Sequence, residues 1–185
     1  MNYVQDAIIW SPGSDGIWRP SNVGKAYYFG SENSIKSDFS RYFEINASYN
    51  FLLTYVLDNY LTFESDKRMP YQPMHTFGFG VTVKWNPGKE YYGNINFTGH
   101  YESVRYIDTL NVGSLPDFFT FNISLNQNFC KIFTFYLTIQ NAFNNHYFLV
   151  DQYPEPNGSV TIGFKINYQM KFKEKEGNKD ENKNE

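Results

Sequence analysis

Hydrophobic and polar residues alternate strictly through the C-terminal third of the sequence, in runs at 118–128, 131–141 and 159–172. Successive side chains on a β-strand point to opposite faces, so each run predicts a strand with one apolar and one polar face. A soluble sheet could contain one such strand, whereas several in series favour a barrel wall with lipid outside and water inside. The apolar positions are Phe119, Phe121, Ile123, Leu125, Phe133, Phe135, Leu137, Ile139, Val160, Ile162, Phe164, Ile166, Tyr168, Met170 and Phe172.

Five earlier strands are predicted from the same alternation. The clearest is 42–60, where Phe43, Phe51 and other odd-numbered apolar residues oppose polar even-numbered ones, and 3–10 is the most weakly patterned. The sequence therefore predicts an all-β, antiparallel transmembrane β-barrel segment of about eight strands. The five earlier strands are expected at 3–10, 21–36, 42–60, 74–85 and 90–106.

The predicted connections alternate between long and short. The long ones are 11–20, 61–73, 107–117 and 142–158, and the short ones are 37–41, 86–89 and 129–130. This alternation is typical of outer-membrane barrels, which have brief periplasmic turns and long extracellular loops. Aromatic residues such as Trp85 and Tyr91 flank the short connections, where amphipathic rings suit a membrane interface. Aromatic residues at strand ends of a soluble sheet are the alternative reading.

The composition agrees with strands rather than helices as membrane spans. The 185 residues are 41% hydrophobic, with a mean hydropathy of -0.54. Half of a transmembrane strand of about 9–11 residues can be polar, so such proteins score as hydrophilic. Aromatic residues make up 20% of the chain, which suits positions that face lipid or lie at the interface. No run approaches the roughly 20 apolar residues of a spanning helix.

The net charge and the sequences of the two termini further limit the classes of protein that the chain could belong to. A formal net charge of -3 without a basic cluster gives no support for a nucleic-acid partner. The N-terminus shows no secretion signal, from which we expect the chain to be the C-terminal piece of a longer protein. Residues 173–185 hold four Lys, five acidic residues and no apolar side chain, which predicts a disordered tail. The expected division is thus a barrel segment at 1–172 and a charged tail at 173–185.

Candidate catalytic chemistry is sparse. His75, His100 and His146 lie on different segments at no metal-ligand spacing, and Cys130 is the single cysteine. Glu32, Glu44 and Glu102 fall on polar strand faces, where charges can line a wet lumen. A Ser-His-acid constellation need not be adjacent in sequence, but nothing selects one. We expect no enzyme activity, no metal and no cofactor.

Two motifs precede the alternating final strand: residues 141–147 read Asn-Ala-Phe-Asn-Asn-His-Tyr, and 153–158 read Tyr-Pro-Glu-Pro-Asn-Gly. This arrangement resembles the C-terminus of members of the TonB-dependent outer-membrane receptor family. Upstream, 115–116, 68–75 and 18–26 with Gly30 and Glu32 resemble family segments in the family's order. The sequence departs from the family pattern at Ala142, Asn144 and 156–158.

The resemblance implies that the strands correspond to the last eight of a 22-stranded barrel in the outer membrane. Such barrels take up scarce nutrients, for example an iron chelate or cobalamin. The implied partners are outer-membrane lipid, the barrel-insertion machinery, a nutrient ligand and the energising TonB complex. The last two act through an N-terminal part that has no counterpart here. Ligand contacts are expected from aromatic residues in the long loops: Trp18, Tyr71, Tyr147 and Tyr153.

Two other readings stay open at this point. Eight strands suffice to close a small barrel, so the chain could be a self-contained outer-membrane barrel with a structural or adhesive role. A soluble β-barrel carrier would point its apolar face inward. If the chain is instead a receptor segment, we expect a curved open sheet with edges at 3–10 and 159–172.

Overall fold

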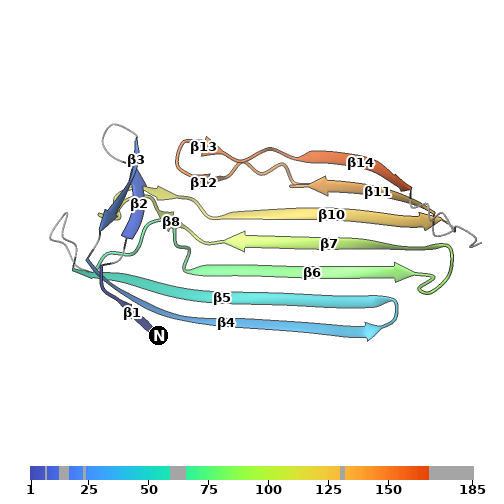
Figure 1. The fold of residues 1–185 in the computed structure, drawn as a ribbon, viewed down its shortest axis with the longest axis horizontal. Coiled ribbons are helices and arrows are strands. Elements are labelled where there is room, and N and C mark those ends of the chain that lie inside the picture. Colours follow the sequence, from blue (N-terminus) through green and yellow to red (C-terminus); the bar gives the residue numbers. More distant parts are fainter. Residues whose placement is uncertain (7, 13–16, 23, 59–65, 130–131, 167–185) are drawn as a thin grey trace, which may run out of the picture.

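The computed structural model describes residues 1–6, 8–12, 17–22, 24–58, 66–129 and 132–166. Within these residues one antiparallel sheet of eight strands dominates the fold, in the order β1-β4-β5-β6-β7-β10-β11-β14 (Figure 1). The all-β antiparallel prediction is confirmed. The strands of this sheet are β1 (Asn2–Val4), β4 (Lys25–Ser40), β5 (Phe43–Asp58), β6 (His75–Trp85), β7 (Tyr92–Glu102), β10 (Phe118–Phe129), β11 (Phe133–Gln140) and β14 (Ser159–Ile166).

From β5 to β14 the strand register places apolar residues beside apolar ones and polar residues beside polar ones. One row of paired residues on the apolar face runs through Ile45, Val81, Phe97, Ile123, Ile139 and Val160. The neighbouring row on the opposite, polar face runs through Glu44, Thr82, Asn96, Ser124, Thr138 and Thr161. A slip of one residue would exchange the two faces, so the alternation of the sequence specifies this register.

The apolar face is exposed rather than packed against a second layer. On β14, Val160, Ile162 and Phe164 are each more than 60% exposed. Aromatic side chains cover neighbouring strands along this face, for example Phe97 stacked with Phe121 at a ring-centroid distance of 6.2 Å. None of the described residues forms a helix that is long and apolar enough to cross a membrane.

The short connections all lie at one end of the sheet and the long ones at the other (Figure 1). Three additional two-stranded pieces lie in the long connections. They are formed by β2 (Ile8–Pro12) with β3 (Trp18–Asn22), β8 (Arg105–Tyr106) with β9 (Ser114–Leu115), and β12 (Phe148–Val150) with β13 (Tyr153–Pro154). The predicted alternation of long and short connections is confirmed.

The first part of the chain differs from the sequence prediction. The expected strand at 3–10 is wrong, because the chain leaves the sheet after β1 and β2 pairs with β3 in a separate hairpin. Asp6 and Gly24 flank this hairpin with φ values of 55° and 81°, a left-handed backbone that ends regular strand geometry. The strand expected at 21–36 accordingly lies at β4, and residues 11–12 and 18–20 of the expected connection 11–20 belong to β2 and β3.

The two ends of the strand order are open in the described residues. β1 pairs only with Ala26–Tyr28, so it covers a small part of β4. β14 pairs with β11 on one side, and no pairing of β14 with β1 closes the sheet. The expected open sheet is confirmed, with β1 rather than 3–10 as its first edge. Closure as a self-contained eight-stranded barrel is not observed.

Gly99 provides space for a large ring on the apolar face. A Cβ atom at Gly99 would lie 2.2 Å from Cε1 of Phe79, the residue paired with it on the adjacent strand. We expect Gly99→Val to force the ring away and to lower the free energy of unfolding by about 1–3 kcal/mol. Urea unfolding of the protein in lipid vesicles measures this loss. The matched variant Gly78→Val, whose Cβ would meet the small side chain of Ser48 at 2.9 Å, should lose less, and equal losses would contradict the assignment.

Candidate functional site

The long connections converge on one buried guanidinium. Arg105 begins β8, directly beyond β7, and its side chain is only 3% exposed. Nη1 lies 3.1 Å from Oε2 of Glu102, and Nη2 donates a hydrogen bond of 2.8 Å to the carbonyl oxygen of Phe148. The guanidinium carbon lies 5.1 Å from the ring centroid of Phe118. Burial lowers the pKa of Arg105 and the Glu102 charge opposes that shift, so the group keeps its charge at neutral pH.

Tyr147 lies on the other side of this cluster. Its ring stacks on Phe118 with a centroid distance of 4.4 Å and an interplanar angle of 19°. Its carbonyl oxygen accepts a hydrogen bond of 3.0 Å from the backbone of Glu155. Burial raises the pKa of Tyr147, and the charges of Glu155 and Glu102 raise it further. The phenol is therefore held neutral beside two carboxylates.

Tyr71 belongs to the segment 66–74 and is fixed by a backbone hydrogen bond to β8. Its backbone N–H donates to the carbonyl oxygen of Tyr106 at 2.7 Å, which joins the segment to β8. Burial raises the pKa of Tyr71, and the charges of Asp151 and Asp108 raise it further. Tyr71 therefore lies between the two long connections that follow it in sequence, 107–117 and 142–158.

The segment 66–74 is also fixed to its neighbours by two polar contacts and a small core. The backbone N–H of Arg68 donates to Asn111 Oδ1 at 2.6 Å, and Asn111 Nδ2 donates back to the Arg68 carbonyl at 2.9 Å. Met69 packs with Ala26 and Val56, and its N–H donates to Thr54 Oγ1 at 3.2 Å. Thr54 pairs with Tyr28, which places this core on the polar face of the sheet.

Polar side chains on that face are bonded to one another across strands. Asn126 Nδ2 donates to Asn94 Oδ1 at 3.3 Å, and Thr134 Oγ1 donates to Asn128 Oδ1 at 2.7 Å. Near the short connections, Glu44 lies between Lys36 at 2.9 Å and Lys84 at 2.8 Å. The centre of the face thus presents neutral amides and hydroxyls, and an ion-pair cluster lies toward one end.

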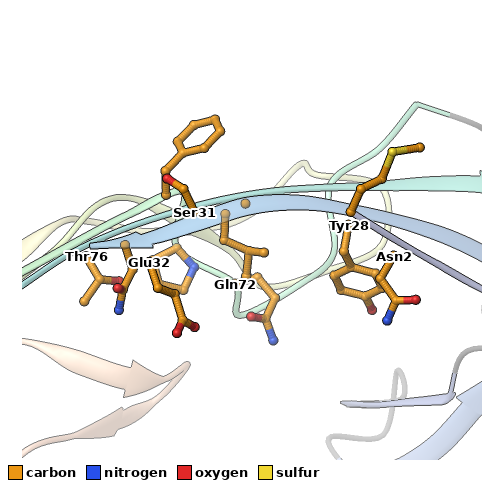
Figure 2. A pocket seen from close by; sticks show the side chains of 12 residues that line it. Asn2, Tyr28, Ser31, Glu32, Gln72 and Thr76 are labelled. Atoms are coloured by element: carbon orange, nitrogen blue, oxygen red, sulfur yellow. The ribbon is translucent and has the colours of Figure 1, made fainter. Parts of the chain in front are cut away.

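Two cavities open on the polar face. The larger, of about 460 Å³, lies beside β4 and under the segment 66–74. Figure 2 shows Tyr28, Glu32 and Thr76 projecting to one side of the sheet together with Asn2 and Gln72. The second, of about 300 Å³, lies next to β13 and is lined by Thr120, Asn122, Gln140, Asn141, Tyr147, Glu155, Pro156, Asn157 and Ser159. The second cavity offers mainly hydrogen-bonding groups, the first adds apolar groups such as Phe51 and Leu52 to its polar ones, and each contains a single carboxylate.

The structure brings together two of the four aromatic residues expected from the sequence. Tyr71 and Tyr147 both adjoin the Arg105 cluster. Tyr153 begins β13 and is 65% exposed, and Trp18 begins β3, where its backbone pairs with Pro12. Arg105 itself was not predicted from the sequence, although its position three residues after Glu102 offers a weak signal.

The Asn-rich motif at 141–147 is a compact turn. Asn141 is 5% exposed with φ of 47°, and its side chain bonds both the N–H and the carbonyl of Asn145. Asn144 Oδ1 accepts a hydrogen bond of 2.9 Å from the N–H of Gly158, which fixes the end of the following connection. This geometry assigns the motif to positioning rather than to direct chemistry.

The histidines have separate partners. Nε2 of His100 lies 3.0 Å from Glu102, and Nδ1 of His75 lies 2.9 Å from the Tyr49 hydroxyl. Across the described part of the chain, no group of three or more His, Cys, Asp or Glu side chains is placed to hold a metal ion. Cys130 lies outside the described residues.

Comparison with known families identifies the class of the chain. A family model described as TonB dependent receptor-like, beta-barrel matches residues 1–142. This span exceeds half of the 185 residues, and the chain therefore belongs to this family. No curated protein sequence matches the chain significantly.

Solved structures of larger proteins share the fold. The siderophore receptor PiuA from Acinetobacter baumannii aligns with a TM-score of 0.70 at 16% identity, over 90% of this chain and 25% of that one. The ferric yersiniabactin uptake receptor FyuA from Yersinia pestis aligns with a TM-score of 0.64 at 17% identity, over 88% of this chain and 25% of that one. The copper transporter OprC gives a TM-score of 0.66 at 16% identity, over 90% of this chain and 27% of that one. The chain thus spans about a quarter of these proteins.

The half-buried phenol of Tyr147 predicts an alkaline limit to the stability of the loop cluster. Its pKa is raised in the folded state, so its contribution is complete below the unfolded value of about 10 and is lost as pH rises through the folded value. We expect Tyr147→Phe to make the loss of stability above pH 10 shallower. Unfolding measured from pH 8 to 11 tests this, with Tyr153→Phe as the exposed control. Identical alkaline profiles for Tyr147→Phe and the unmodified protein would contradict the burial of this phenol.

Proposed function

We propose that the chain forms the C-terminal barrel wall of an outer-membrane receptor that takes up a scarce nutrient. The family match and the two-faced register support this proposal. An apolar face built of aromatic and aliphatic residues suits contact with hydrocarbon, and a face of amides and hydroxyls suits a water-filled interior. The open sheet edges suit a segment of a larger barrel, because unpaired backbone groups in lipid cost several kcal/mol each. The proposal assigns no catalytic role to the chain.

The organisation of the complete receptor is part of the proposal. The eight strands would be the last of a 22-stranded barrel, with 1–172 as the wall and 173–185 as a charged tail. The barrel-insertion machinery and outer-membrane lipid are its proposed partners. A TonB complex would act through the part of the receptor that precedes this segment. The tail and Phe172 lie outside the described residues.

The proposed nutrient is an iron chelate. PiuA and FyuA are receptors for a siderophore and for ferric yersiniabactin, which favours this class over cobalamin. OprC is a copper transporter, so a copper ligand is the second candidate. We propose Trp18, Tyr71, Tyr147 and Tyr153 as ligand contacts, since they lie in or beside the long connections at one end of the sheet.

A charge on the apolar face tests the membrane assignment. Phe121 is the fourth residue of β10 and stacks with Phe97 and Phe143. If this side meets hydrocarbon, Phe121→Arg should destabilise the folded state in a bilayer by about 2–4 kcal/mol. The adjacent Asn122 points to the polar face, and Asn122→Arg should cost less. Denaturant titration of both variants in lipid vesicles measures the difference, and a larger loss for Asn122→Arg would overturn the assignment.

The orientation follows from the connection lengths. Long connections face the outside of the cell in outer-membrane barrels. A cysteine placed at the 84% exposed Val112 should therefore react with an impermeant maleimide on intact cells, whereas one at Gly88 should react only after lysis. Labelling in the reverse pattern would contradict the proposed orientation.

A growth assay tests the transport function. The complete receptor, expressed in a strain that lacks its own iron-chelate receptors, should restore growth on at least one of a panel of ferric catecholates, hydroxamates and mixed chelates. A receptor with its TonB-contacting segment deleted is the control. Copper uptake, measured by elemental analysis, would select the second candidate instead. Failure to support uptake of any of these, with the protein folded in the outer membrane, would overturn the proposal.

A further inference from the structure

We infer that Arg105 is a positioning residue that locks the segments 66–74, 103–117 and 141–158 into one unit and thereby fixes Tyr71 and Tyr147. The role of these tyrosines as ligand contacts rests on the proposed function. The lock itself rests on contacts within the chain. It would give a ligand one preorganised surface in place of three independent loops.

The first part of the lock is the guanidinium fork. Arg105 reaches the Glu102 carboxylate with Nη1 and the Phe148 carbonyl with Nη2, so one side chain joins the end of β7 to the start of β12. A charge that is 97% buried needs such partners, because an unpaired buried charge is strongly unfavourable. A lysine offers a point charge and cannot reproduce the planar fork in both directions.

The second part is the aromatic stack. Phe118 contacts the guanidinium on the one hand, at 5.1 Å, and the Tyr147 ring on the other, at 4.4 Å. Cation-π attraction of this kind strengthens when the cation is desolvated. The orientation of Tyr147 therefore depends on Arg105 through the ring that both side chains contact.

The third part connects Tyr71. Its backbone N–H donates a hydrogen bond to the carbonyl oxygen of Tyr106, the residue next to Arg105. The charges of Arg105 and Asp151 also act on its hydroxyl. The reciprocal bonds between Arg68 and Asn111 join the same two segments a second time. Loss of the guanidinium would remove the bond that holds the segment 141–158 at Phe148. Because Tyr147 and the Asp151 that lies beside Tyr71 both belong to this segment, Tyr71 and Tyr147 would become exposed together.

Tyrosine nitration tests the lock without a ligand. Tetranitromethane, which reacts with accessible phenolates, would be applied to the complete receptor in detergent, and each tyrosine would be quantified by mass spectrometry. In Arg105→Met we expect several-fold faster nitration of both Tyr71 and Tyr147. The exposed Tyr153 should react at the same rate in every variant. Arg105→Lys should restore part of the protection, and Glu102→Gln should weaken it less than Arg105→Met.

Arg41→Met is the matched control. Arg41 also lies over an aromatic ring, 4.7 Å from the Tyr42 centroid, but it is at the end of the sheet with the short connections. It should leave the nitration of Tyr71 and Tyr147 unchanged. If Arg105→Met does not fold, as judged by its migration in unheated detergent gels, the Lys and Gln variants decide the question.

Unchanged protection of both tyrosines in folded Arg105 variants would overturn the lock. Faster nitration of only one of them would equally contradict a single unit. Neither result bears on uptake, because the nitration assay contains no ligand. Conversely, a receptor that fails the growth assay but shows the predicted nitration pattern would retain the lock and lose the proposed function.

Discussion

The structure depends on one constraint, the parity of side chains along paired antiparallel strands. Hydrogen bonding of the backbone fixes which residues lie beside each other, and alternation fixes which face each residue occupies. The same strand register produces both the apolar row from Ile45 to Val160 and the polar row from Glu44 to Thr161. A sheet of this kind separates two environments by itself, without a buried core of its own. This is why the described core is limited to a few residues, Ala26, Val56 and Met69 among them.

The end of the sheet with the long connections is held together in a different way. There the backbone leaves the sheet, and order comes from side chains that satisfy buried polar groups: Asn111 between two segments, Asn141 within its turn, and Arg105 between the end of β7 and the segment 141–158. Rigid strands place the bases of the loops, and these polar contacts set how the loops lie relative to one another. Tyr71 and Tyr147, two of the four residues proposed to touch ligand, are held by this second set of contacts.

Much of the sheet could be predicted from the sequence, because period-2 alternation reports the faces directly. The hairpin at 8–22 could not, since Ile8, Ile9 and Trp10 favour a strand but do not say which strand they pair with. Its separation from the sheet depends on the left-handed backbone at Asp6 and Gly24. The Arg105 cluster was missed for a similar reason: its partners Phe118, Phe148 and Tyr147 are distant in sequence and come together only through the topology of the loops.

The central claim, that the apolar face meets lipid and the polar face meets water, is tested most directly by site-directed spin labelling of the complete receptor in bilayers. Nitroxides would be placed on the paired residues Ile123 and Ile139, and on the paired residues Ser124 and Thr138 of the opposite face. We predict that the first pair collides preferentially with oxygen, which concentrates in hydrocarbon. The second pair should collide preferentially with a water-soluble nickel chelate. Equal access of both reagents to both faces, or the reverse preference, would contradict the account.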